Sequence, residues 1–197
     1  YSAVRTLTKS TSVCSACPNP VSFHGYDYET VMIGTQCWFA ENLRTTKYRD
    51  GTDVPLKSDN ADWSLTTPGY SWYDNDYATY GSKYGALYNW YSVDETSNGG
   101  YYLCPTGWSV PSVTDWDLLR TYLSTNNGYC VPSSGGNNFW IAKPLASTSD
   151  WQTYTSECTP GYDQVTNNST GFNAFPSGNR SSGGTCGNYT STAAFWS

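Results

Sequence analysis

The loop sequence WYDNDY, residues 72–77, holds the side chains best suited to bind a ligand. Asp74, Asn75 and Asp76 offer oxygen atoms at consecutive loop positions, which is the chemistry that calcium requires. The same group suits a sugar, because aromatic rings stack on its apolar face while Asp and Asn bond its hydroxyls. A third interpretation is an Asx-rich turn whose aromatic residues belong to the core. Calcium, bound by Asp74, Asn75 and Asp76, is the one cofactor that the sequence suggests.

Residues for catalysis are scarce in this chain. His24 is the only histidine, so a triad of nucleophile, histidine and acid would depend on it alone. The CxxC motif CSAC, residues 14–17, has no second ligand pair for zinc, and Pro18 follows where a redox motif would open a helix. The acidic residues show no spacing that selects a glycosidase pair. We therefore expect a protein that is not an enzyme.

Composition favours an extracellular or cell-surface location. The chain has 197 residues, of which 13% are charged, and its formal net charge is −6. An acidic chain is a poor match for a phosphate backbone, so nucleic acid is not an expected partner. No apolar run approaches the length of a membrane span.

Cysteine usage points to an oxidising compartment. Seven cysteines in so polar a chain are typical of disulfide-bonded proteins, and the odd number leaves one thiol free or without its partner. The expected disulfide cysteines are Cys14, Cys17, Cys37, Cys104, Cys130, Cys158 and Cys186.

The elements that must position these groups are short. Residues 1–20 form a leader whose YSAVRTLT alternates weakly, as an edge strand or a donated strand would, although a frayed leader is an equal alternative. YETVMIG and QCWFAENL predict a hairpin joined at Gly34 and Thr35. Residues 53–80 are predicted to be a long irregular region, which in a compact domain is usually functional.

SVTDWDLLRTYL is the clearest helix. Ser112 or Thr114 can cap it, and acidic residues stand in its first turn, where the helix dipole favours them. Apolar residues recur at three- and four-residue spacing, which predicts one buried face. That face consists of Trp116, Leu119, Tyr122 and Leu123.

Five motifs stand in a fixed order: TVMIGTQCWFAENLRTTKYRDGT, YGALYNWYSV, LCPTGWSVPSVTDWDLL, GFNAFPSGNRSSGG and AAFWS. In this order they resemble the Fibrobacter succinogenes major paralogous domain, over about Glu29 to Ser197. The resemblance implies an α+β, C-type-lectin-like fold with twisted antiparallel strands, one or two short helices and long structured loops. It implies a single domain over residues 21–197 behind the leader of residues 1–20.

Family members usually continue past the FWS element into a strand that reads like GFSVRCV, whereas this sequence stops at Ser197. The resemblance therefore implies either a missing last strand or one supplied by another chain. It further implies that Trp38 and Phe39 fill the core and that Cys37 bonds to Cys17 or Cys14. Glu41, Asn42 and Arg44 would form a polar scaffold that holds long loops. The residues expected to be buried are Trp38, Trp90, Trp108, Trp116 and Phe195.

The surface expected to contact a partner combines SWYDNDY with NRSSGGTCGNYT, since both are too polar for a core and too aromatic for a linker. Its expected ligand-binding residues are Trp72, Tyr73, Asp74, Asp76, Asn179, Arg180, Asn188 and Tyr189. The first functional interpretation is an adhesion module that recognises a glycan or a surface protein. The alternative is a structural subunit of an extracellular filament or pilus-like polymer, self-associating by strand exchange.

Overall fold

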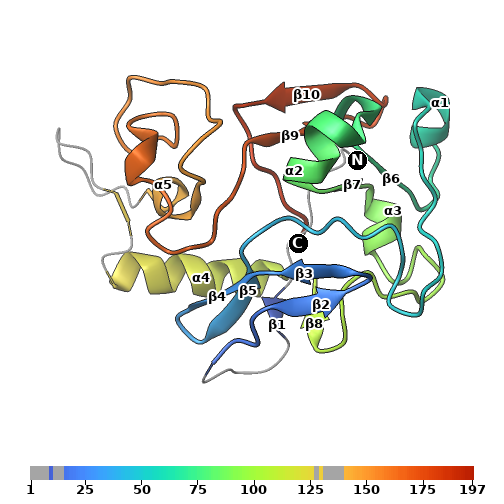
Figure 1. The fold of residues 1–197 in the computed structure, drawn as a ribbon, viewed down its shortest axis with the longest axis horizontal. Coiled ribbons are helices and arrows are strands. Elements are labelled where there is room, and N and C mark those ends of the chain that lie inside the picture. Colours follow the sequence, from blue (N-terminus) through green and yellow to red (C-terminus); the bar gives the residue numbers. More distant parts are fainter. Residues whose placement is uncertain (1–8, 11–15, 127–128, 131–139) are drawn as a thin grey trace.

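The computed structural model describes residues 9–10, 16–126, 129–130 and 140–197. This part of the chain mixes short helices with short strands in small sheets, which confirms the α+β class. Figure 1 shows two ends of the molecule: one carries the four-stranded sheet, and the other carries β9 and β10 with α1 and α2.

The four-stranded sheet has the order β4-β5-β1-β8 and is antiparallel throughout. The predicted hairpin is confirmed, because Gly34 and Thr35 join its first two strands. Gly34 has a φ of +63°, and a Cβ there would lie 2.9 Å from the ring of Tyr122, so the turn requires glycine. The strands of this sheet are β1 (Lys9–Ser10), β4 (Thr30–Ile33), β5 (Gln36–Phe39) and β8 (Trp108–Ser109).

Three two-stranded sheets complete the described strands, and in each the partners are antiparallel. They pair β2 (Val21–Phe23) with β3 (Tyr26–Tyr28), β6 (Tyr70–Ser71) with β7 (Leu87–Tyr88), and β9 (Ser177–Arg180) with β10 (Cys186–Tyr189).

The long predicted helix is α4 (Val113–Thr125), and Ser112 caps it in a capping box with Asp115. Its predicted face is correct in part: Leu119 and Leu123 are buried and Trp116 is half-buried. The prediction that Tyr122 belongs to the buried face is wrong, because this residue is 41% exposed. It lies over Gly34, at the rim of the sheet and not inside the core.

The described residues form more helical turns than the one or two short helices expected, and each apart from α4 is brief. Part of the predicted irregular region, residues 53–80, is built from these turns. They are α1 (Asn60–Trp63), η1 (Tyr73–Asn75), η2 (Tyr77–Gly81), α2 (Ser82–Tyr84), α3 (Trp90–Val93), α5 (Ala142–Leu145) and η3 (Gln164–Thr166).

Aromatic rings dominate the core, as the composition predicted. Trp38 and Trp108 are buried, whereas Trp90, Trp116 and Phe195 are half-buried, and none of the five is exposed. The half-buried rings still pack, since Trp116 stacks on Phe195 at 5.6 Å and tilts against Trp38 at 5.0 Å between centroids. The C-terminal motif therefore covers α4 and the sheet.

The described residues form two disulfides, Cys17–Cys37 and Cys130–Cys158. The first confirms that Cys37 bonds to the leader. The expectation that Cys104 and Cys186 form disulfides is wrong, because both are free thiols among the described residues. They belong to two different core clusters, Cys104 to the large one and Cys186 to a smaller one around Trp63.

Two sequence-based expectations can be compared with the described residues only in part. Cys14 lies outside the described residues, so its predicted pairing stays a prediction. Within the part of the chain that the structure describes, no helix has the length and apolarity needed to cross a membrane.

Candidate functional site

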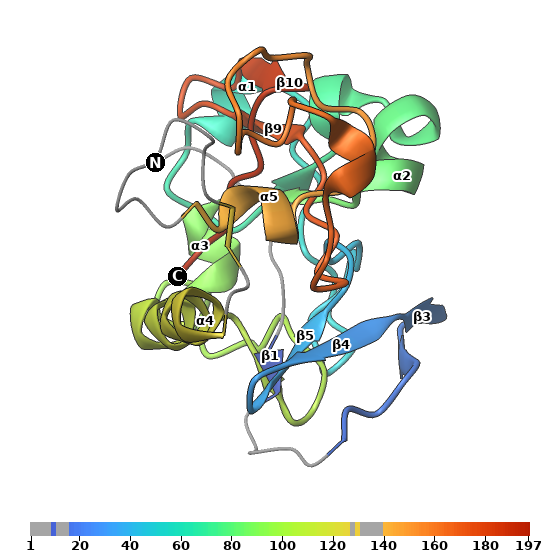
Figure 2. The same ribbon diagram turned by 90° about the vertical axis from the view of Figure 1, so that its left-hand side faces the viewer.

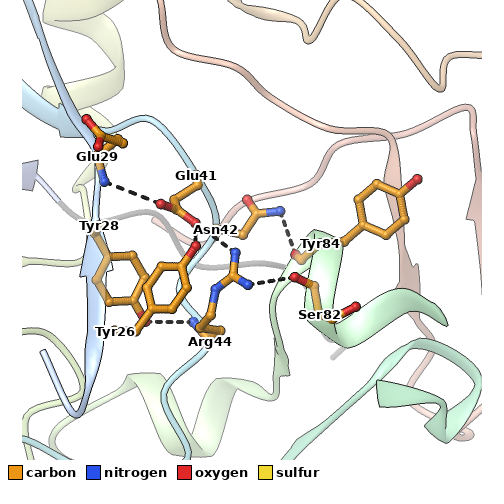
Figure 3. Close-up of polar contacts among 8 residues, drawn as sticks. All are labelled: Tyr26, Tyr28, Glu29, Glu41, Asn42, Arg44, Ser82 and Tyr84. Carbon is orange, nitrogen blue, oxygen red and sulfur yellow. Dashed lines mark hydrogen bonds and ion pairs between the residues drawn. The ribbon is translucent and has the colours of Figure 1, made fainter. Parts of the chain in front are cut away.

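The charges that follow β5 form a scaffold, as predicted. Glu41 accepts hydrogen bonds of 2.7 Å from Tyr26 Oη and from Arg44 Nη2, while Arg44 Nη1 donates to the carbonyl oxygen of Ser82 at 2.7 Å. Figure 3 shows this network between β3 and α2. Burial and the bond to Glu41 raise the pKa of Tyr26 to about 12, so its phenol remains a proton donor at neutral pH.

Asn42 extends the same scaffold. Its Nδ2 donates to the carbonyl oxygen of Tyr84 at 2.9 Å, and both residues are buried (Figure 3). The backbone N–H of Arg44 donates to Tyr28 Oη at 3.1 Å. These side chains satisfy loop backbone that no strand pairs, which explains why charged and amide groups concentrate there.

The first candidate functional site is the slot between β5 and β8, which β1 fills. Lys9 pairs with Trp38 on one side and with Ser109 on the other, and Ser10 pairs with Trp108. Without β1, the facing edges of β5 and β8 would both lack strand partners, and such edges recruit other strands. This slot is therefore a receptor for an extended segment.

The second candidate is the predicted contact surface, whose two segments do meet. The Tyr73 and Tyr189 rings lie 5.5 Å apart, and the backbone N–H of Asp74 donates to Cys186 Sγ at 3.3 Å. Tyr84 Oη lies 3.0 Å from Tyr189 Oη. Contacts between η1 and β10, more than 100 residues apart in sequence, thus bring the two polar segments together.

Arg180 is wrong as a ligand-binding residue, because its side chain is fully buried. It donates to the carbonyl oxygens of Lys57 and Gly184 at 2.7 Å and to Asn60 Oδ1 at 3.0 Å. Its guanidinium carbon lies 4.6 Å from the centroid of the Trp63 ring, and burial lowers its pKa. Arg180 thus joins β9 to the segment around α1.

The other predicted contact residues differ in how much of each side chain is exposed to solvent. Tyr73 is buried, and Trp72, Asp76, Asn179 and Tyr189 are half-buried. Asp74 and Asn188 are exposed. Tyr77 belongs to the predicted SWYDNDY segment but not to the expected ligand-binding residues; it is 54% exposed and packs edge-on against Trp72 at 4.9 Å. The residues of these two segments that are most open to a partner are therefore Asp74, Tyr77 and Asn188, whereas Tyr73 belongs to the core.

The contacts of the predicted calcium ligands leave little for a cation. Asn75 Nδ2 donates to the carbonyl oxygen of Ser58 at 2.9 Å, and Asn75 Oδ1 accepts from Arg180 at 3.4 Å. Asp76 caps η2 by accepting from the N–H of Thr79, and hydrogen bonds from the side chain and the backbone of Thr79 lower its pKa. Within the described residues no group of three or more His, Cys, Asp or Glu could hold a metal ion. Calcium binding by Asp74, Asn75 and Asp76 stays a prediction.

A third feature, which sequence reasoning missed, is a groove between the β4–β5 turn and α4. Its volume is about 410 Å³. Residues that line it include Ile33, Gly34, Gln36, Leu118, Tyr122 and Thr125. Leu118 is the residue in the sequence that could have revealed this groove. It is apolar, yet it directly precedes Leu119 and so does not fit the three- and four-residue spacing of the predicted buried face.

These features define a class of protein: a disulfide-bonded α+β domain in which the strand β1 lies inside the main sheet, between β5 and β8. The chain belongs to the Fibrobacter succinogenes major domain family, whose profile matches residues 31–197. Comparison with curated proteins and with solved structures gave no significant match. The strand β1 precedes the matched residues, so the slot in the family domain is filled by a segment from outside it.

Proposed function

We propose that the protein is a structural subunit of an extracellular polymer, in which β1 of one chain fills the slot between β5 and β8 of the next. The observation that carries this proposal is the central position of β1, a strand that precedes the family domain. A donated strand binds through its backbone, as β1 does on both sides. The two disulfides support an oxidising, extracellular setting.

The connection between β1 and the body favours exchange. Cys17 is fixed to β5 through Cys37, and six residues separate it from Ser10. Seven Cα steps span at most about 25 Å, so a donor body must sit close to its acceptor. A short hinge next to an exchangeable strand is a common route to swapped assemblies, because the same contacts form in either chain.

Cross-linking distinguishes exchange between chains from pairing within one chain. Lys9 and Ser109 are direct antiparallel partners, so cysteines placed at both positions would be close enough to form a disulfide. Oxidised Lys9→Cys/Ser109→Cys protein should give a ladder of covalent multimers on a non-reducing gel. The two single variants control for linkage through native cysteines. A cross-linked monomer without a ladder would show that β1 stays in its own chain and would refute the proposal.

Adhesion is a second candidate, and the packing of the exposed Tyr77 ring against the half-buried Trp72 favours it. The two rings offer a stacking face, and the exposed Asp74 lies between them in the sequence, which suits a glycan or a protein partner. Tyr77→Ala should weaken binding on a glycan array and leave the melting temperature nearly unchanged. Unchanged binding would remove Tyr77 from any such site.

We also propose that the domain has a C-type-lectin-like fold, which the family resemblance and the mixed helices and small sheets support. An experimental structure would test this through its strand order. A strand order different from that of lectin-type domains would contradict it.

A further inference from the structure

We propose that the groove between α4 and the β4–β5 turn receives the body of the neighbouring subunit that donates β1. This inference rests on the proposed strand exchange and adds to it a second, non-strand interface. Its occupant is a second copy of this chain.

The direction of β1 carries the first step. Because β1 is antiparallel to β5 and Lys9 pairs with Trp38, the chain runs from Ser10 toward the Gln36 end of β5. Gln36 and Gly34 line the groove at that same end. A donor chain entering the slot would therefore approach past this end, and the short connection to Cys17 would hold its body nearby.

The position of the groove carries the second step. Gln36 Nε2 donates to the carbonyl oxygen of Asp115 at 3.2 Å, and the Tyr122 ring packs over Gly34, so helix and turn form one continuous surface. Figure 2 shows α4 nearly end-on beside the β4–β5 hairpin, at the end of the molecule away from β9 and β10. The groove thus shares Gln36, a residue of β5, with the strand that forms one side of the slot.

The chemistry of the groove carries the third step. Its lining residues are all uncharged, on a chain with a formal net charge of −6. Copies of such a chain repel one another, so a self-contact is favoured where charge is absent. Leu118 is 55% exposed and Tyr122 is 41% exposed, which leaves apolar area for a partner to cover.

The test is Leu118→Arg in the full-length chain. Because Leu118 is exposed, the variant should fold with an unchanged melting temperature. An arginine in the groove should raise the critical concentration for assembly by about tenfold or more, since it replaces buried apolar area by a charge without a partner. Val165→Arg is the matched control, at a residue that is 80% exposed in η3, and should assemble like the parent.

The interface also predicts an asymmetric effect. A Leu118→Arg chain can still donate its strand to a parent chain but receives no donor itself, so adding it to the parent should shorten the polymers. Thr121→Lys, at another exposed position lining the groove, should behave in the same way. Parent-like assembly by both variants would overturn the groove proposal.

The two proposals fail differently. Strand exchange fails if Lys9→Cys/Ser109→Cys cross-links only within one chain. The groove fails alone if that protein forms a ladder while Leu118→Arg and Thr121→Lys assemble normally.

Discussion

Arg180 Nη1 donates a 2.7 Å hydrogen bond to the carbonyl oxygen of Lys57, a residue 123 positions earlier in the chain. The same guanidinium bonds the carbonyl oxygens of Ser58 and Gly184, so three backbone acceptors depend on one buried side chain. Arg180 therefore stabilises the fold through these hydrogen bonds, and the effect of replacing it on the free energy of unfolding can be measured.

Replacing Arg180 with Met should lower the free energy of unfolding by about 3 kcal/mol or more, because buried carbonyls lose their donors. Arg120→Met is the matched control, since Arg120 is exposed and makes a surface ion pair with Asp117. Its cost should stay below about 0.5 kcal/mol. Urea denaturation measures both, and equal midpoints would contradict the assigned role.

Removing the Cys17–Cys37 disulfide in the Cys17→Ala/Cys37→Ala variant should cost about 3 kcal/mol, because the bond closes a loop with a sequence separation of 20. A calorimetric melting temperature measures the change. An unchanged melting temperature would show that leader and hairpin are held by other contacts.

The two free thiols of the described residues should differ in reactivity. Cys104 is buried, and burial raises its pKa to about 12, so almost no thiolate is present at neutral pH. Cys186 is half-buried, so a reagent can reach its sulfur more easily, although burial raises its pKa as well. Iodoacetamide followed by peptide mapping should therefore label Cys186 first. Equal labelling in the native protein would contradict the burial of Cys104.

Tyr48 should make the protein sensitive to alkali. Its hydroxyl is buried without a hydrogen-bond partner among the described residues, and burial raises its pKa to about 12. The unfolded phenol ionises near pH 10, so the unfolded state loses its proton first and stability falls as the pH rises from about 10 to 12. Tyr48→Phe should remove the part of this fall that Tyr48 causes, leaving the parts due to other buried tyrosines such as Tyr26 and Tyr28, and should cost nothing at pH 7.

The control for Tyr48 is Tyr88→Phe. Tyr88 Oη donates to the carbonyl oxygen of Thr45 at 2.7 Å, so its loss should cost about 1 kcal/mol at pH 7. Denaturation curves at pH 7 and pH 11 measure both variants. A Tyr48→Phe variant that is as alkali-sensitive as the parent would contradict the prediction.

The features that the sequence determined by itself are local. Gly34 at a tight turn, Ser112 before an acidic helix start and Cys37 on a strand near a cysteine-bearing leader each depend on a few neighbours or one short loop. The hairpin, the helix cap and the Cys17–Cys37 bond accordingly matched their predictions.

Tertiary structure alone decided which of those residues are available to a partner. Arg180 and Tyr73 stand in polar segments, yet both are buried, because α1 and β10 come from distant parts of the chain and cover them. The slot filled by β1 is equally invisible in sequence, since β5 and β8 are about 70 residues apart and strand pairing is made by backbone that every residue shares. Burial and pairing depend on which distant segments meet, and side-chain type at one position does not encode that.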